Sequence, residues 1–224
     1  VLNGQLVPGY APSRNANPDL AWEKATAFNI GLDFVTLNSR LRGSVEYFDR
    51  RSKDLLYTYN APQPPYTYDK ILVNVGTIKN TGVEVALDFD AIVKKQFSWT
   101  TGINYSYGTS KLTKLSNDVF SESSLPLGSK GDIGSNEYFF KTLEGGKINE
   151  FFGYRYAGFE DGVMLVYNKD GEAIPTTQAK EDDKDYIGNA TPEHFLAWNN
   201  TLRYGQWDLS FMFRGAFGFD IFNK

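Results

Sequence analysis

Strict alternation of apolar and polar residues over long segments is the feature that most constrains the fold of this chain. In residues 97–108, FSWTTGINYSYG, every second residue except Thr101 is large and apolar or aromatic, and the residues between are small or polar. A period of two residues is typical of a β-strand with two unlike faces. The aromatic face covers either a protein core or a lipid bilayer, and these alternatives imply different functions.

Five further segments repeat this pattern. They are residues 27–34, 41–47, 83–90, 196–204 and 207–214. Short links join the segments in pairs, namely TLNSR, AIVKKQ and the turn at Gly205-Gln206. We therefore predict three antiparallel hairpins with short connections.

The hairpins are joined to one another by much longer connections. Residues 50–80 contain three prolines and four tyrosines, and the tract from about 109 to 190 contains the acidic run KEDDKD. Short connections at one end and long ones at the other are typical of an outer-membrane barrel, with short periplasmic turns and long extracellular loops. We predict an all-β fold that forms part of an antiparallel transmembrane β-barrel. A soluble β-sandwich is the alternative, since it too combines alternating strands with long loops.

Composition removes several other classes. The net charge of −4 argues against a nucleic-acid-binding protein, and the absence of cysteine excludes disulfides and thiolate zinc sites. No run of 18 apolar residues is present, so no transmembrane helix is expected. The mean hydropathy of −0.41 is compatible with a barrel, because half of each strand faces a wet lumen.

Each face of the strands has a predicted environment. The apolar faces run for about 9–11 residues, the length of a tilted strand that crosses a bilayer. The residues expected to face lipid are Phe97, Trp99, Ile103, Tyr105, Tyr107, Trp207, Leu209, Phe211 and Phe213. The residues expected to face the lumen are Asn29, Asp33, Glu84, Asp88, Asn104 and Arg214. Trp and Tyr near strand ends suit an interfacial girdle.

Seven segments, taken in chain order, resemble segments of SusC/RagA-type TonB-dependent transporters. They are NPDLAWEKATAFNIGLDF (17–34), LNSRLRGSVEYFDRRSKDLL (37–56), NVGTIKNTGVEVALDFD (74–90), FSWTTGINYSYGTSKLTKL (97–115), FFGYRYAGF (151–159), YIGNATPEHF (186–195) and WDLSFMFRGAFGFDIFN (207–223). The first is similar to the family's Asn-Pro-x-Leu-x-Trp-Glu stretch, and the third to its Asn-x-Gly-x-x-x-Asn-x-Gly-x-Glu segment. Residues 116–150 and 160–185 carry no such resemblance.

The resemblance implies that residues 1–224 are a fragment from the C-terminal half of a 22-stranded barrel, without the plug domain and the TonB-contacting segment. It implies a place in the outer membrane of a Gram-negative bacterium and TonB-driven import of nutrients. The substrates would be oligosaccharides, or peptides as in some members, and the expected partners are a SusD-like surface lipoprotein and the TonB complex. The alternatives are a peptide importer of the same family and a soluble β-sandwich that binds glycans.

Four tyrosines in the first long connection are the candidate ligand or partner contacts. They are Tyr57, Tyr59, Tyr66 and Tyr68. Tyrosine suits interfaces because its ring is apolar and its hydroxyl is polar. We favour partner contact or loop packing over stacking on a ligand.

No catalytic set can be assembled from the sequence, and no metal or cofactor is expected. His194 is the single histidine and is interpreted as a polar residue at a strand start. Glu84 and Asp88 share a strand face but would lie roughly 13 Å apart at about 3.3 Å per residue, too far for a glycosidase pair. The alternating charges of KEDDKD indicate a solvated loop, without the fixed spacing of a calcium site.

Overall fold

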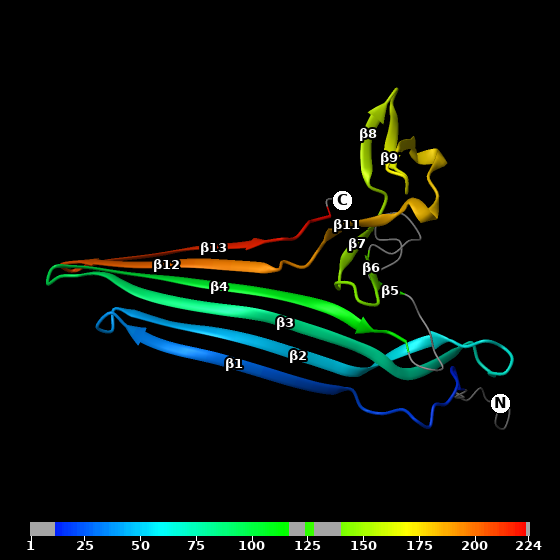
Figure 1. The fold of residues 1–224 in the computed structure, drawn as a ribbon, viewed down its shortest axis with the longest axis horizontal. Helices are drawn as coiled ribbons and strands as arrows, with labels where there is room; N and C mark the ends of the chain where they lie inside the picture. Colours follow the sequence, from blue (N-terminus) through cyan, green and yellow to red (C-terminus); the bar gives the residue numbers. More distant parts are fainter. Residues whose placement is uncertain (1–11, 117–123, 128–139, 223–224) are drawn as a thin grey trace, which may run out of the picture.

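A long six-stranded sheet dominates the structure, a computed structural model that describes residues 12–116, 124–127 and 140–222. All neighbouring strands are antiparallel, in the order β1-β2-β3-β4-β12-β13 (Figure 1). The strands are β1 (Lys24–Thr36), β2 (Leu41–Asn60), β3 (Lys70–Val93), β4 (Phe97–Lys114), β12 (His194–Tyr204) and β13 (Trp207–Phe217). The prediction of an antiparallel all-β fold is confirmed, and within the described residues the sheet is open at both edges.

The three short connections lie together at one end of the sheet, at the left of Figure 1. The turn between β1 and β2 holds Leu37, Asn38 and Ser39 in the left-handed region, with φ of 54°, 55° and 65°. The turn between β12 and β13 uses Gly205 at φ 59°, a conformation that glycine adopts without strain. The predicted hairpins and their tight ends are therefore present.

The strands are longer than predicted. β2 has 20 residues and β3 has 24, whereas about 9–11 suffice to cross a bilayer. Tyr57 and Tyr59 consequently lie in β2, not in a loop, and only residues 61–69 connect β2 to β3. The sequence pattern missed this because the mostly charged residues 50–54 and a bulge near Leu55 interrupt the alternation, which resumes at Tyr57 and Tyr59 in β2 and at Ile71, Val73 and Val75 in β3.

The second long connection is folded, which corrects its interpretation as a plain loop. β5 (Ser124–Leu127), β6 (Phe140–Leu143), β7 (Glu150–Gly153) and β11 (Asp185–Asn189) form a four-stranded sheet. β8 (Tyr156–Glu160), β9 (Val163–Tyr167) and β10 (Ala173–Pro175) form a three-stranded one, followed by the 3-10 helices η1 (Thr176–Gln178) and η2 (Glu181–Asp183).

Both small sheets rise at the long-connection end and do not cover a face of the main sheet (Figure 1). The arrangement is therefore not that of a sandwich, in which two sheets pack face to face. The parts of this connection at 117–123 and 128–139 lie outside the described residues. No helix in the described part of the chain is long and apolar enough to cross a membrane.

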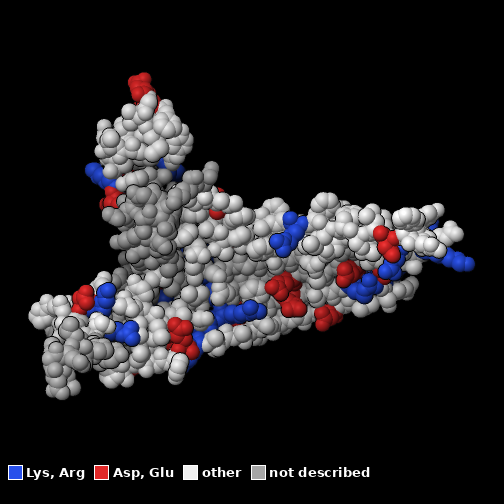
Figure 2. Space-filling view, turned by 180° about the vertical axis from the view of Figure 1, so that it is seen from behind, with Lys and Arg blue, Asp and Glu red and all other residues white. Residues whose placement is uncertain are grey.

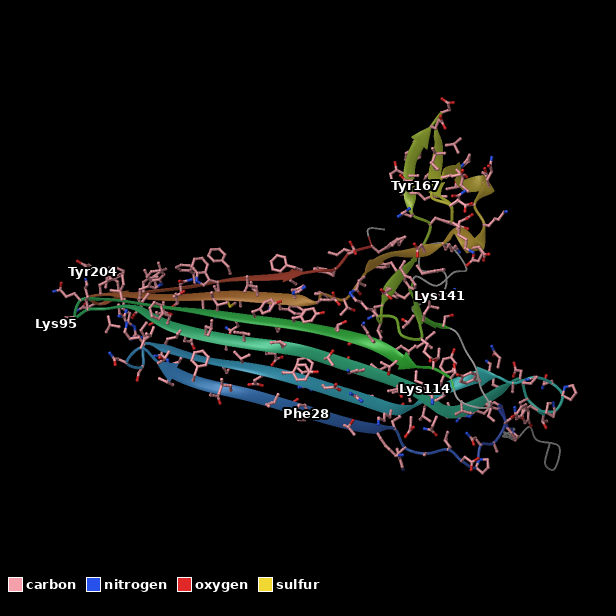
Figure 3. All side chains as sticks on the ribbon, in the orientation of Figure 1. Phe28, Lys95, Lys114, Lys141, Tyr167 and Tyr204 are labelled. Atoms are coloured by element: carbon pink, nitrogen blue, oxygen red, sulfur yellow. The ribbon has the colours of Figure 1, made fainter. Side chains whose placement is uncertain are left out.

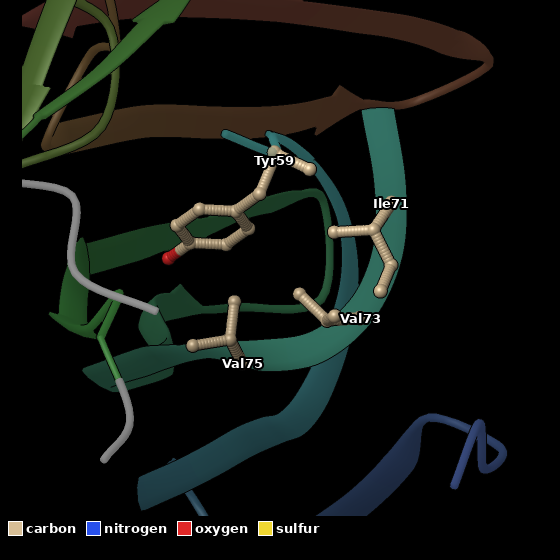
Figure 4. Packing of buried hydrophobic residues seen from close by; sticks show 5 residues of the cluster. Tyr59, Ile71, Val73 and Val75 are labelled. Atoms are coloured by element: carbon tan, nitrogen blue, oxygen red, sulfur yellow. The ribbon is translucent and has the colours of Figure 1, made fainter. Parts of the chain in front are cut away.

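A small hydrophobic core lies where β2 and β3 extend beyond the other strands. Its buried members are Tyr59, Ala61, Ile71, Val73 and Val75 (Figure 4). The Tyr59 hydroxyl donates a hydrogen bond to the backbone carbonyl of Leu115, itself buried. The core thus ties the β2–β3 extension to the segment that follows β4.

Two glycines that face each other across β3 and β4 differ in the space around them. Gly82 is paired with Gly108. A Cβ built on Gly82 would lie 2.2 Å from the Tyr107 carbonyl oxygen and 2.5 Å from the Phe48 ring, whereas one on Gly108 would lie 3.7 Å from that ring. Only Gly82 is therefore required for the close approach of β3 to its neighbours.

We expect Gly82→Ala to destabilise the full-length protein by about 1–3 kcal/mol, because the methyl group overpacks the contact between β3 and its neighbours. Gly108→Ala is the matched control and should change the free energy of unfolding by much less. Denaturant unfolding of the detergent-solubilised protein measures both. Equal effects of the two substitutions would contradict the packing described here.

Candidate functional site

The register of the main sheet sorts the side chains of all six strands onto two faces. Residues paired directly across antiparallel strands share a face, and Ile103 is paired with Leu87 on one side and with Trp198 on the other. By this register the nine residues expected to face lipid lie on one face, and the six expected to face the lumen lie on the other. We call these the apolar face and the polar face.

The apolar face carries large side chains that are exposed. Trp207 is 81% exposed, Leu32 67% and Phe213 62%. Further exposed members are Phe28, Ile30, Val45, Tyr47, Ile103, Leu196, Trp198, Tyr204, Leu209 and Phe211; Figure 3 shows rings along the sheet and labels Phe28 and Tyr204. An apolar surface that spans six strands marks contact with a partner or a membrane.

Two tryptophans of this face have their indole N–H groups satisfied within the protein. Trp99 donates to the Asn200 side-chain oxygen at 3.0 Å, and Trp198 donates to the Thr101 hydroxyl at 2.8 Å. Thr101 and Asn200 are paired across β4 and β12, so each tryptophan reaches its acceptor diagonally. An indole N–H without a partner is costly in an apolar environment, and these bonds remove that cost.

No local sequence pattern indicates these two hydrogen bonds. Thr101 interrupts the aromatic alternation of β4, and Asn200 interrupts that of β12, but the bonds between these strands join residues 97–101 positions apart. Asn200 is only 2% exposed and lies between Trp198 and Leu202 on the apolar face. The available signal was that each of the two strands has one polar residue in its aromatic alternation, Thr101 in β4 and Asn200 in β12; these two residues are paired.

The polar face contains a hollow of about 350 Å³ between β2, β3, β4, β12 and β13. Its polar lining includes Ser44, Glu46, Glu84, Asn104, Ser106 and Arg214. Glu46 and Glu84 are directly paired across β2 and β3, an arrangement of like charges that is unfavourable unless solvent or a cation compensates it. Figure 2 views the molecule from behind and shows acidic and basic groups along the sheet.

The short-turn end of the polar face is fixed by an ion-pair cluster. The Arg42 guanidinium contacts both carboxylate oxygens of Asp90, at 2.8 and 3.2 Å, and the Thr100 hydroxyl donates to Asp90 at 3.0 Å. Arg40 donates to the backbone carbonyls of Asp90 and Ala91. These bonds hold the β1–β2 turn against the end of β3.

The four candidate tyrosines do not form one surface. Tyr59 is 3% exposed and packs in the small core, with the Tyr57 ring edge-on to it at 5.0 Å. Tyr66 is half-buried and packs against the same core, and Tyr68 is half-buried in the 61–69 connection. Tyr59 therefore has a packing role, and ligand or partner contact by the other three stays a prediction.

His194 begins β12, as its interpretation as a strand-start residue predicted. Its Nδ1 lies 2.8 Å from the Tyr105 hydroxyl, and its ring lies 4.9 Å from that of Tyr107. The preceding Glu193 forms an ion pair with Lys147 at 2.9 Å, and hydrogen bonding to Glu193 raises the pKa of Lys147. The His194 contacts attach the start of β12 to β4, and the Glu193–Lys147 ion pair attaches it to the folded connection.

The acidic run in residues 180–185 is used for local structure. Backbone N–H groups of Lys180 and Lys169 donate to the Asp183 carboxylate at 2.7 and 3.1 Å and hold its pKa below the ordinary value. Asp182 pairs with Lys169 at 3.3 Å. Within the described residues, no group of three or more His, Asp or Glu has the arrangement of a metal site.

We expect the loop around Asp183 to loosen in acid. Because the folded-state pKa is lowered, the stabilisation is present above the unfolded-state pKa of about 4 and is lost as pH falls through the folded value. Hydrogen exchange, corrected for intrinsic rates, should show protection of the Lys169 and Lys180 amides falling below about pH 4. Asp183→Asn should reduce this protection at neutral pH, and Asp170→Asn in the same loop should not.

Comparison with known proteins agrees with this architecture. The family model described as TonB dependent receptor-like, beta-barrel, matches residues 2–222. TonB-dependent receptor P3 of Formosa agariphila is 28% identical, with 100% of this chain and 23% of the relative covered. TonB-dependent receptor SusC of Bacteroides thetaiotaomicron is 27% identical, with 89% and 20% covered.

Solved structures show the same relation. A structure of the RagAB peptide transporter is similar with a TM-score of 0.73 at 27% identity, covering 94% of this chain and 23% of that one. RagAB in the open-open state gives a TM-score of 0.76 at 25% identity, covering 94% and 22%. The chain spans about a quarter or less of the length of these relatives. With an open six-stranded wall of two unlike faces, the chain belongs to the TonB-dependent receptor-like β-barrel family.

Proposed function

We propose that this chain forms part of the barrel wall of an active nutrient importer in the outer membrane of a Gram-negative bacterium. The observation that carries the proposal is the apolar face, which crosses all six strands and is exposed on five of them, whereas the charged side chains level with Phe97–Tyr107 lie on the opposite face. A bilayer on one side and an aqueous lumen on the other account for both faces. Membership of the TonB-dependent family supports the same assignment.

The height of the apolar face fits this role. On β4 it runs from Phe97 to Tyr107, roughly 34 Å along the strand and roughly 26 Å across the membrane at a tilt of about 40°. An outer-membrane barrel presents an apolar band of about 25 Å. The short turns would then face the periplasm, and the folded connection would face the outside.

The polar face would line the lumen, where Glu46, Glu84 and Arg214 meet the plug domain or the passing substrate. Transport of this kind draws energy through the TonB complex, which contacts segments outside this chain. The SusC and RagAB relatives support a SusD-like surface lipoprotein as partner. The folded connection and the half-buried Tyr66 and Tyr68 lie at the end of the wall where such a partner would dock.

The proposed substrates are oligosaccharides, taken up without covalent change, so the protein would not act as an enzyme. Peptides are the second candidate, because the similar RagAB structures are described as those of a peptide transporter and importer. Glu46, Glu84 and Arg214 give the polar face charges of both signs. Such charges would pair with those of a plug domain or of a peptide substrate.

We expect the full-length protein to fractionate with the outer membrane and to require detergent for extraction. A closed barrel resists unfolding in cold detergent, so the unboiled and boiled protein should migrate differently on gels. Clean recovery in the soluble fraction without detergent would exclude the barrel assignment and favour a soluble glycan-binding module.

We expect the complete transporter, with its surface lipoprotein, to bind oligosaccharides more tightly than peptides of matched mass. Calorimetric titration of both ligand classes against the same purified complex measures the difference. Tighter binding of peptides would replace the oligosaccharide assignment with the peptide one, and would leave the barrel assignment intact.

A further inference from the structure

A row of cations crosses the sheet just beyond the outer limit of the apolar face. The register pairs Arg51 of β2 with Lys79 of β3, and Lys79 with Lys111 of β4. The backbone of Lys111 in turn forms an isolated antiparallel β-bridge with that of Lys147 in the folded connection. Directly opposed like charges destabilise a sheet, so four cations side by side need a compensating anion.

These cations lie on the same side of the sheet as the apolar face. Arg51, Lys79 and Lys111 follow the alternation of Tyr47, Val83 and Tyr107, four residues further along their strands. Four residues correspond to roughly 14 Å along a strand, or roughly 10 Å across the membrane at the same tilt. A lysine side chain at this height reaches the head-group layer, which occupies roughly 5–8 Å beyond the hydrocarbon.

The carboxylates near the row do not neutralise it. Lys147 pairs with Glu193, and on β1 Lys24 pairs with Asp54. Asp49 forms ion pairs with both Arg51, at 2.9 Å, and Lys79, at 3.2 Å. Lys53 and Lys111 are both exposed, and neither has an ion-pair partner among the described residues. The row therefore keeps an excess of positive charge in a chain whose net charge is −4.

A hollow of about 470 Å³ joins this row to the apolar face. Its lining includes Phe28 and Tyr47 from the apolar face, and Asp49, Arg51 and Lys53 from the charged zone above. An amphipathic molecule with an anionic head and an apolar tail matches this order, with the tail along the rings and the head among the cations. Arginine and lysine both bind phosphate oxygens, arginine with two donors at once.

We propose that Arg51, Lys79 and Lys111 of the row, together with Lys53 two residues beyond Arg51 on β2, bind the phosphate of a lipid in the outer leaflet, whose acyl chains lie on the apolar face. The proposal rests on the orientation in the membrane given under the proposed function. The occupant is a phosphorylated lipid and not a soluble anion, because the hollow continues from the cations onto exposed aromatic rings.

The test uses the full-length receptor in detergent, with native mass spectrometry to measure bound lipid. The probes are lipid A, which carries phosphate, and the same lipid after enzymatic removal of its phosphate. The double variant Lys53→Gln/Lys111→Gln removes the two cations without carboxylate partners. The control Lys94→Gln/Lys95→Gln removes two exposed lysines at the opposite end of the sheet, where Figure 3 labels Lys95.

We expect the double variant to bind phosphorylated lipid about 30-fold more weakly, and the control to match the wild type. Heat-modifiable migration of both variants shows that each is folded. Equal affinity for the phosphorylated and dephosphorylated lipids, or equal affinity of the double variant and the control, would overturn the proposal. Displacement of the lipid by an excess of inorganic phosphate alone would assign the row to soluble phosphate and overturn the lipid assignment.

Different results would contradict the proposed function and the proposed lipid site. A receptor found in the soluble fraction contradicts the proposed function. A receptor found in the outer membrane whose lipid binding is independent of phosphate contradicts only the lipid site.

Discussion

Antiparallel backbone pairing in a single register is the constraint on which the rest of this structure depends. Side chains alternate with a period of two, so a slip of one residue in any strand would move its aromatic residues to the polar face. The observed pairs match aromatic or aliphatic residues across neighbouring strands, as with Val85 and Tyr105. The close approach at Gly82, where no Cβ fits, helps to hold β3 in this register.

Along the paired strands, three regions follow one another from the short turns to the long connections. The aromatic and aliphatic side chains of the apolar face come first, next to the short turns. The cation row of Arg51, Lys79 and Lys111 follows. Beyond it, β2 and β3 curl around the core that contains Tyr59. One continuous sheet therefore carries the proposed lipid-facing wall, the proposed phosphate-binding zone and the core that supports the long-connection end.

The sequence predicted most strands of the six-stranded sheet, but few of the side-chain contacts between distant segments. Alternation in 97–108 and its five counterparts was enough to find the hairpins and to sort residues such as Ile103 and Asn104 onto opposite faces. The extension of β2 and β3 was missed because charged residues and a bulge near Leu55 separate its short apolar alternation from that of the hairpins. The two small sheets were missed because strands of three to five residues carry too little alternation.

Contacts between distant segments explain the remaining omissions. The Trp99–Asn200 and Arg42–Asp90 bonds join residues 101 and 48 positions apart, so no local pattern reveals them. The same holds for the cation row, which consists of ordinary charged residues until the register brings them together. Tyr59 resembled an exposed loop tyrosine in sequence and is buried because β2 continues to Asn60.

We propose that one face of this wall meets lipid and the other meets the lumen. Ile103→Cys, Asn104→Cys, Tyr105→Cys and Ser106→Cys each introduce a single spin-label site into residues 1–224, which contain no cysteine. The measurement uses the membrane-embedded receptor, with the receptor that lacks these substitutions as the labelling control. Labels at 103 and 105 should collide preferentially with oxygen, which partitions into lipid, over a water-soluble nickel chelate. Labels at 104 and 106 should show a much lower ratio of oxygen to nickel collisions. If the ratio of oxygen to nickel collisions does not alternate along residues 103–106, or alternates in the reverse sense, the proposed orientation of the two faces is wrong.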